Sequence, residues 1–176
     1  MVWGIGLFLI IVAFLFFFWF FPVFFNGIPW QPTDMKRVRR MLEMANLKPG
    51  EVVYDLGCGD GRIIICAAQE FGAQAVGVEL NPWLYLLALL KVWIRGLSPR
   101  VKVIFGNLHQ VDLKDADVVT IFLYSHVNDL LQEKFWRELK PGARIVSYFW
   151  DLKDWRPVNV DSKYNLYLYV KNSANQ

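Results

Sequence analysis

The chain has 176 residues, a net charge of +3 and two cysteines. Once an uncharged N-terminal stretch is set aside, about 150 residues remain, which is enough for one domain. The small positive charge gives no support for nucleic-acid binding. The two cysteines and two histidines show no zinc-binding spacing, so we predict no metal site.

The N-terminal stretch predicts a membrane anchor. Residues 2–25 contain no charged side chain and are rich in Phe, Ile, Leu and Val. As a helix, this stretch would span about 36 Å, enough to cross the roughly 30 Å hydrocarbon core of a bilayer. Tryptophans, which anchor helices at membrane interfaces, lie near its ends at Trp3, Trp19 and Trp30. A cleaved signal peptide is disfavoured because no basic region precedes the stretch and no small-residue cleavage site follows it. We therefore expect residues 1–25 to form a transmembrane helix that contacts the bilayer through residues 2–25.

The charges that follow predict the orientation of this anchor. Every charged residue lies at or after Asp34, and four basic residues come soon afterwards, namely Lys36, Arg37, Arg39 and Arg40. The positive-inside bias places the domain on the cytoplasmic side, or on the matrix side in an organelle. The basic cluster would contact anionic headgroups or form a solvated helix face. Residues 26–33 are expected to be a linker and residues 34–176 the domain.

The rest of the chain alternates strand and helix patterns. In chain order it predicts a helix at 34–46 capped by Thr33 or Asp34, a strand at 51–56, a helix at 61–71, a strand at 75–79, a helix at 82–95, strands at 101–105 and 118–123, a helix at 127–139, a strand at 143–149, and an antiparallel hairpin at 158–160 and 164–170. This order predicts an α/β fold with a Rossmann-like, doubly wound, mostly parallel sheet. Helical spacing assigns Trp83 and Trp93 to the core.

A glycine-rich turn follows the first strand. Residues 52–62 read VVYDLGCGDGR, so an apolar strand passes through a carboxylate into three alternating glycines. Gly57, Gly59 and Gly61 permit positive φ and a close approach of the backbone to a ligand. The helix that follows points free N–H groups toward the same place. The pattern indicates a nucleotide-type cofactor site at the carboxyl edge of a parallel sheet.

Two acidic residues distinguish between cofactors. Asp55 would repel a pyrophosphate, and Arg62 stands where a dinucleotide fingerprint has its third glycine. An ammonium beside a sulfonium suits Asp55, and the methionine part of S-adenosylmethionine supplies both. Glu79, 24 residues later at the end of the next strand, can accept hydrogen bonds from two ribose hydroxyls. We predict S-adenosylmethionine as the cofactor; the alternatives are a nicotinamide or flavin site and a structural turn with solvated acids.

On these residues the chain resembles class I, seven-β-strand S-adenosylmethionine-dependent methyltransferases. Over residues 29–170 it is also similar to the mitochondrial lysine methyltransferases of the ATP synthase c-subunit and the adenine nucleotide translocase, and to archaeal protein lysine methyltransferases. The segments that carry the resemblance are PWQPT at 29–33, DLGCGDGRIII at 55–65, GVELNPWL at 77–84, VTIF at 119–122 and PGARI at 141–145.

The resemblance implies a set of cofactor-binding residues, namely Pro32, Thr33, Asp55, Gly57, Cys58, Gly59, Glu79, Leu80, Asn107 and Leu108. Pro32 and Thr33 would close over the cofactor, and Asn107 and Leu108 would lie near the adenine. Three departures stand out. Cys58 replaces a usual serine, His109 stands where mitochondrial members tend to have tryptophan, and residues 149–151 differ from their F-P-F-P stretch. His109 and residues 149–151 border the expected binding place of the target, so the identity of the substrate is the property that the resemblance predicts least well.

The implied reaction is methyl transfer to a lysine ε-amine of a membrane or membrane-adjacent protein. Tyr124, after the fourth strand, would line the lysine channel, and Asp151, after the fifth, would help to remove a proton; either is alternatively an ordinary loop residue. Residues 122–125 read FLYS rather than the NPPY-like run of base methyltransferases, so nucleic acid is not expected as a substrate. The alternatives are a lipid or quinone methyltransferase and a non-catalytic cofactor-binding module.

Overall fold

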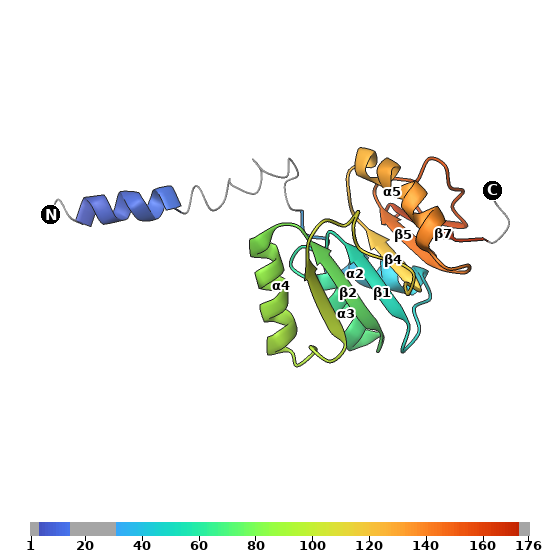
Figure 1. Cartoon of the computed structure of the whole chain (residues 1–176), viewed down its shortest axis with the longest axis horizontal. Helices are drawn as coiled ribbons and strands as arrows, with labels where there is room; N and C mark the ends of the chain where they lie inside the picture. Colours follow the sequence, from blue (N-terminus) through green and yellow to red (C-terminus); the bar gives the residue numbers. More distant parts are fainter. Residues whose placement is uncertain (1–3, 15–30, 173–176) are drawn as a thin grey trace. The chain divides into compact units, whose positions relative to one another are not determined.

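The computed structural model describes residues 4–14 and 31–172. The chain divides into two units, Met1–Gln31 and Pro32–Gln176 (Figure 1). In the first unit, residues 4–14 form a helix with exposed apolar side chains such as Phe8. No helix within the described ranges combines the length and apolarity needed to cross a bilayer. The predicted transmembrane helix is therefore not shown. Residues 1–3 and 15–25 of the predicted anchor, and residues 26–30 of the predicted linker, lie outside the described part of the chain.

The second unit is built on a seven-stranded sheet with the order β3-β2-β1-β4-β5-β7-β6 (Figure 1). The strands are β1 (Val52–Leu56), β2 (Gln74–Glu79), β3 (Val101–Phe105), β4 (Val118–Ile121), β5 (Arg144–Tyr148), β6 (Asn159–Asp161) and β7 (Leu166–Val170). Neighbouring strands from β3 to β5 are parallel, whereas β7 is antiparallel to both β5 and β6. The predicted mostly parallel α/β sheet with a C-terminal hairpin is confirmed.

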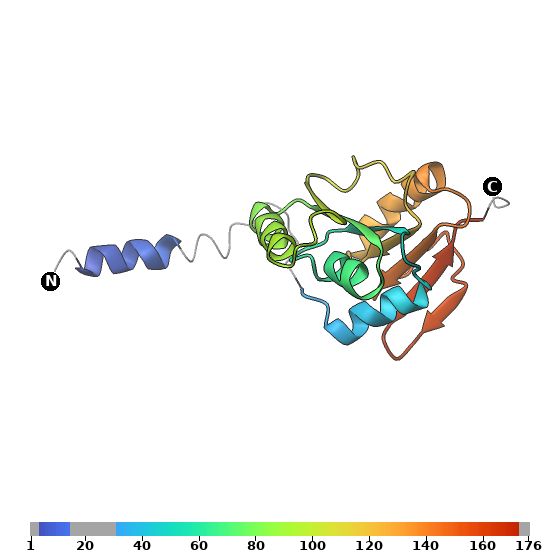
Figure 2. The same ribbon diagram turned by 90° about the horizontal axis from the view of Figure 1, so that it is seen from below.

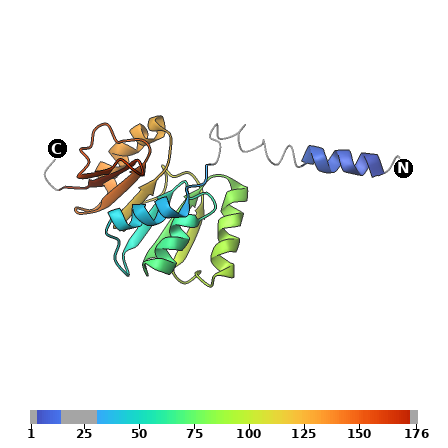
Figure 3. The same cartoon turned by 180° about the vertical axis from the view of Figure 1, so that it is seen from behind.

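Helices cover both faces of this sheet. They are α2 (Met35–Met44), α3 (Arg62–Glu70), α4 (Pro82–Ile94) and α5 (Ser125–Glu138). Helices α2 and α3 lie on one face and α5 on the other, as Figures 2 and 3 show. Because successive strand residues point to opposite faces, β1 contributes Val53 to one buried cluster and Leu56 to the other. Strand order reverses direction at β1, which places a ligand crevice at the carboxyl ends of β1 and β4.

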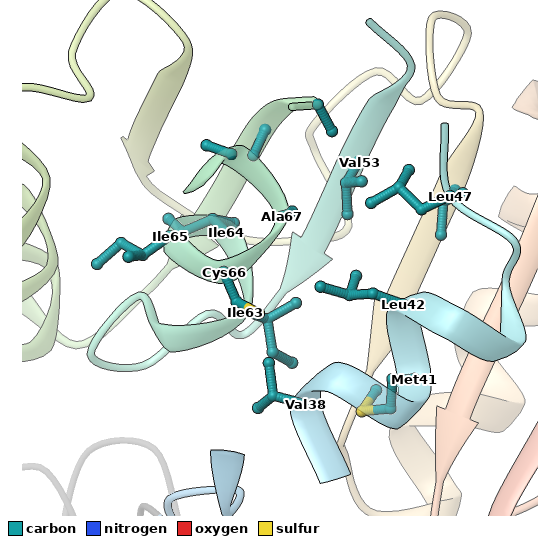
Figure 4. Close-up of a cluster of buried hydrophobic side chains, with 14 of the residues drawn as sticks. Val38, Met41, Leu42, Leu47, Val53, Ile63, Ile64, Ile65, Cys66 and Ala67 are labelled. Atoms are coloured by element: carbon teal, nitrogen blue, oxygen red, sulfur yellow. The ribbon is translucent and has the colours of Figure 1, made fainter. Parts of the chain in front are cut away.

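Helix α2 shows how the sequence pattern determines the packing. Asp34 caps it by accepting a hydrogen bond from the Arg37 backbone N–H at 3.0 Å. Its apolar stripe of Val38, Met41 and Leu42 is fully buried. These side chains pack against α3 and β1 (Figure 4). Burial of each contributes about 1.5–3 kcal/mol to folding, and this packing fixes the start of the second unit beside the glycine turn.

Helix α4 contradicts one sequence prediction. Trp83 and Trp93, assigned to the core, are 42% and 71% exposed, whereas Ala88 and Val92 are the buried residues of α4. The helix has apolar residues on all sides and a single charged residue, Lys91, so spacing alone cannot tell which side packs inward. Close packing decides the orientation. A Cβ added to Gly61 would lie 3.1 Å from the Cβ of Ala88, and only a small residue permits that approach.

Element boundaries differ from the sequence prediction by at most two residues. One of the two-residue differences concerns the fourth strand, predicted at 118–123, which ends at Ile121. Helix α5 correspondingly begins at Ser125 rather than at residue 127, with Tyr124 as its N-cap residue. This shift matters because it fixes Tyr124 in extended backbone at the start of a helix.

Candidate functional site

The glycine turn between β1 and α3 has the conformation that its sequence predicts. Gly57, Gly59 and Gly61 all have positive φ, at 83°, 55° and 81°. The backbone N–H groups of Gly57 and Cys58 both donate to the Val78 carbonyl, at 2.9 and 3.0 Å, which fastens the turn to β2. A Cβ on Gly57 would be 3.0 Å from the Leu123 Cδ2 atom. The turn is therefore a narrow backbone cradle that a side chain would fill.

Glu79, at the end of β2, holds the turn in place. Its Oε2 atom accepts a hydrogen bond from the Gly59 N–H and its Oε1 atom one from the Asn81 N–H, both at 2.8 Å. Burial raises the pKa of Glu79, although these backbone N–H groups oppose the shift. A carboxylate has about four acceptor positions, so two remain for ligand hydroxyls. Glu79 thus stabilises the turn through two hydrogen bonds and keeps two acceptor positions that can bind a ribose.

Asp55 is a buried carboxylate without a cationic partner. It is only 3% exposed, and within the described ranges no Lys, Arg or His forms an ion pair with it. The Thr120 hydroxyl, on the neighbouring strand β4, donates to its Oδ1 atom at 2.8 Å. Burial raises the pKa of Asp55 to about 7, the hydrogen bond from Thr120 lowers it, and the charges of Glu79 and Asp60 raise it further. A cationic ligand would relieve this cost, so the site fits the ammonium and sulfonium of S-adenosylmethionine.

A charged network beside the turn was missed by the sequence analysis. Two guanidinium nitrogens of Arg62 donate to the buried Asp60 carboxylate at 2.8 Å each, and Lys91 of α4 donates to it at 2.5 Å. A third nitrogen of Arg62 donates to the Thr33 carbonyl at 2.5 Å. Burial favours a raised pKa of Asp60, but Arg62 and Lys91 hold the pKa below its ordinary value. The network ties the segment before α2 to the turn. The sequence signal for this network was GDGR at residues 59–62.

The remaining predicted cofactor residues lie around this carboxyl edge. Thr33 is buried and Pro32 is exposed beside it, while Leu80 follows Glu79 and is half-exposed. Cys58 is buried, and a Cβ on Gly77 would lie 2.7 Å from its Sγ atom. Burial raises the pKa of the Cys58 thiol well above its ordinary range. Cys58 therefore acts as a small packing residue of the turn.

Asn107 and Leu108 follow β3 at the same edge. Asn107 accepts a hydrogen bond from the His109 backbone N–H at 2.9 Å, and Leu108 packs against the buried cluster on the α5 side. The Gly106 N–H donates to the Glu79 carbonyl at 3.0 Å, which brings this loop beside the end of β2. No cluster of three or more His, Cys, Asp or Glu able to hold a metal occurs in the described part of the chain.

The ends of β4 and β5 form an aromatic rim. The Phe122 and Tyr148 rings lie 4.1 Å apart between centroids, and the Tyr124 ring stacks on His126 at 6.0 Å. Phe149 has φ of 74°, a strained conformation for a bulky residue. Rings of several kinds therefore gather where the fourth and fifth strands end.

Two polar residues missed by the sequence analysis support this rim. The buried Asn128 of α5 donates to the Trp150 carbonyl at 3.4 Å, and the Ser147 hydroxyl donates to the same carbonyl. Asp151 follows Trp150 and is exposed. No hydrogen bond joins Tyr124 to Asp151 among the described residues.

Comparisons with known proteins agree with this site. The family model of the ANTKMT methyltransferase domain matches residues 55–159. The protein-lysine N-methyltransferase of Saccharolobus islandicus is 44% identical over 150 residues, covering 81% of this chain and 93% of that protein. The adenine nucleotide translocase lysine N-methyltransferase of Mus musculus is 41% identical over 76% of this chain and 58% of that protein.

A solved structure is similar over most of the chain. The RNA methyltransferase from Salinibacter ruber, in complex with S-adenosyl-L-homocysteine, superposes with a TM-score of 0.80 at 36% identity, covering 83% of this chain and 97% of that one. The chain spans little more than half the length of the Mus musculus relative. S-adenosylmethionine is the cofactor, and the chain is an S-adenosylmethionine-dependent methyltransferase. It belongs to the family of the ANTKMT methyltransferase domain.

Proposed function

We propose that this enzyme is a protein-lysine N-methyltransferase that acts on a membrane or membrane-adjacent protein. The observation that carries the proposal is the 44% identity to a protein-lysine N-methyltransferase over 93% of that protein's length. The Mus musculus relative and the ATP synthase c-subunit lysine N-methyltransferase of Homo sapiens, 33% identical, carry names of the same reaction class. The proteins in these two names give the proposed target class.

The cofactor supplies an electrophilic methyl group on its sulfonium, so the chain's residues mainly bind, orient and exclude water. We assign the cofactor-binding role to the buried half of the carboxyl edge, with Asp55, the Gly57 turn and Glu79. The incoming lysine must lose a proton, which costs about 4.6 kcal/mol at pH 7 from a pKa near 10.4. An apolar channel lowers that cost because burial disfavours the ammonium form.

The aromatic rim is the proposed lysine channel. Tyr124 lines it, and the half-exposed Phe149 and Trp150 form its outer wall. Asp151 follows this wall and is exposed, so it can pass a proton from the incoming lysine ammonium to water before the amine attacks the methyl group.

The membrane part of the proposal has separate support. Residues 2–25 are uncharged and apolar, and residues 4–14 form a helix with exposed Ile, Leu and Phe side chains. We propose that residues 2–25 anchor the enzyme in a bilayer, with the domain on the cytoplasmic or matrix side. Anchoring would raise the effective concentration of membrane-embedded targets.

The test incubates the full chain with methyl-labelled cofactor and host membranes. We expect label in a protein band, lost when lysines are blocked beforehand and absent with the G57V variant. Label extracted into organic solvent would instead establish a lipid or quinone substrate. Ribonuclease-sensitive label would establish RNA, the substrate class in the name of the Salinibacter ruber protein. Cofactor binding without transfer to any fraction would establish a non-catalytic module.

A further inference from the structure

Helix α4 presents a continuous apolar face to solvent. Its exposed large side chains are Trp83, Leu86, Leu87, Leu90, Trp93 and Ile94. They recur at intervals of three and four residues, which places them on one side of the helix, here called the outer face of α4. The opposite side packs on the domain through Ala88 and Val92. A soluble helix normally carries polar residues on its exposed side, and Lys91 is the one charged residue in α4.

The chain segment that carries this face contains basic residues but no acidic ones. Residues 80–111 contain four basic residues and no Asp or Glu. Lys91 forms an ion pair with Asp60. The other three, Arg95, Arg100 and Lys102, are exposed and form no ion pair with a carboxylate in the described part of the chain. Basic side chains without a carboxylate partner therefore follow an exposed apolar stripe that ends in Trp93 and Ile94.

The basic cluster of α2 gives a contrast within the same domain. Arg37 pairs with Asp34, Arg39 with Glu70 at 2.7 Å, and Arg40 with Asp161 at 2.6 Å. Those three arginines are neutralised by the protein itself, so Lys36 is the one residue of the α2 cluster that forms no ion pair with a carboxylate among the described residues. Arg95, Arg100 and Lys102 follow the exposed side chains of α4 in the chain, and none of the three has a carboxylate partner among the described residues.

We propose that the outer face of α4 lies against an anionic lipid bilayer, with its leucines and tryptophans at the headgroup boundary and Arg95, Arg100 and Lys102 on lipid phosphates. Charge complementarity favours an anionic bilayer as the partner of this face. A second copy of the chain would bring like charges together across the face, whereas an anionic membrane complements them. Leucine and tryptophan on one side of a helix bordered by basic residues is the composition of helices that lie in membrane interfaces.

This contact would set the orientation of the enzyme, which a tether alone cannot do. Helix α4 starts directly after Asn81, whose backbone N–H binds Glu79, so the outer face begins beside the cofactor edge. Docking through α4 would hold that edge close to the bilayer surface, within reach of lysines at headgroup level. The inference goes beyond the proposed reaction, because neither cofactor binding nor the identity of the methyl acceptor depends on it.

The test uses the full chain with an environment-sensitive nitrobenzoxadiazole label on Trp93→Cys. The native Cys58 and Cys66 are buried, so the label reports position 93. The matched control places the label on Glu133→Cys of α5, where the side chain is 91% exposed. Vesicles contain phosphatidylcholine with or without phosphatidylserine. We expect phosphatidylserine vesicles to shift the emission at 93 to shorter wavelength and to reduce iodide quenching there several-fold, with position 133 unchanged. High salt should weaken the shift.

Further outcomes separate tethering from docking. Equal responses at 93 and 133 would mean that the chain is only tethered, and the inference would fail. Protection at 93 that grows with protein concentration without vesicles would identify a second copy as the occupant. Leu86→Glu with Leu90→Glu should abolish the shift at 93 while leaving the affinity for S-adenosylhomocysteine within about twofold of the parent. Because cofactor binding and methyl transfer are measured separately, failure of docking is distinguishable from failure of the proposed function.

Discussion

The ends of β1 and β2 and the ends of β4 and β5 form two halves of one sheet edge with different construction. In the first half, Glu79 and Asp55 are buried and the turn is fixed by backbone hydrogen bonds to Val78 and Glu79. In the second half, Tyr124 is partly exposed and Phe149 and Trp150 are exposed, and contacts are mainly between rings.

The difference teaches which part of the enzyme is general and which is particular. Backbone geometry and two carboxylates form the cofactor half, and they are fixed by hydrogen bonds within one βαβ unit. Side chains on loops form the other half, where exposed rings and Asp151 follow the ends of β4 and β5. Substitutions in the first half should therefore change cofactor affinity, and substitutions in the second should change methyl transfer only.

The largest expected effect comes from Gly57→Val. A branched side chain at φ of 83° is strained, and its Cβ would fill the cradle 3.0 Å from Leu123. We expect affinity for S-adenosylhomocysteine to fall by more than about 100-fold, or about 2.7 kcal/mol, in isothermal titration calorimetry. Gly142→Val is the matched control, since Gly142 also has φ of 83° but open space around it. It should lose stability without losing affinity. Equal loss in both variants would place the cofactor elsewhere.

Glu79→Ala should have the next largest effect. The substitution removes the acceptor for the Gly59 and Asn81 N–H groups and for the ribose hydroxyls. Loss of charge-assisted hydrogen bonds of this kind costs about 1–3 kcal/mol, or roughly 5- to 150-fold in affinity. Glu133→Ala, on the exposed face of α5, is the control and should bind normally. An unchanged affinity for Glu79→Ala in calorimetry would contradict the assigned ribose role.

The first half was largely predictable from sequence because its signals are local. The glycine turn, its preceding acid and the acid that ends the next strand all lie within a single βαβ unit, and the structure places Gly59 and Glu79 in direct contact. The strands were predicted to within two residues because their apolar runs are bounded by turns. What the sequence could not supply was the neighbour across the sheet. Thr120 is 65 residues from Asp55, and only the register of β1 on β4 pairs them.

Other failures have related causes. The Asp60–Lys91 contact joins residues 31 apart through the packing of α4 on the turn, which periodicity cannot reveal. Trp83 and Trp93 were assigned to the core from their helical spacing, yet α4 has apolar residues on both sides and packs through Ala88. The positive φ of Phe149 had no sequence signal, since glycine or asparagine is usual there.

Asp55 should make cofactor binding depend on pH. Its pKa of about 7 in the cofactor-free protein means that a cationic ligand, which prefers the carboxylate, competes with a proton. If only the ionised form binds, affinity should fall about tenfold between pH 8 and pH 6. Asp55→Asn should bind weakly at all pH values without that slope. A wild-type affinity that is constant across this range would show that Asp55 stays ionised.

Asp55 should also make the stability of the fold depend on pH, but in the opposite direction to the pH dependence of cofactor binding. The pKa of Asp55 is raised on folding, so between pH 4 and pH 7 the folded state holds more protons than the unfolded state. Its contribution to the free energy of unfolding is therefore lost as pH rises toward 7. Urea unfolding of the cofactor-free wild type should show this decline, and Asp55→Asn should not. Thr120→Val should move both pH midpoints upward, because its hydroxyl lowers the pKa of Asp55, while Thr120→Ser should not.

The smallest expected change in cofactor affinity comes from Tyr124→Phe. Tyr124 lies in the aromatic rim as the N-cap residue of α5, and its hydroxyl is not needed for the ring contact with His126. We expect the affinity for S-adenosylhomocysteine to stay within about twofold, whereas single-turnover methyl transfer should slow by up to about tenfold through the loss of one hydrogen bond to the incoming amine. Calorimetry and a labelled-methyl assay on the same preparation measure the two quantities. A drop in cofactor affinity comparable to that of Glu79→Ala would mean that the two halves of the edge form one binding site, and the division of labour between them would have to be abandoned.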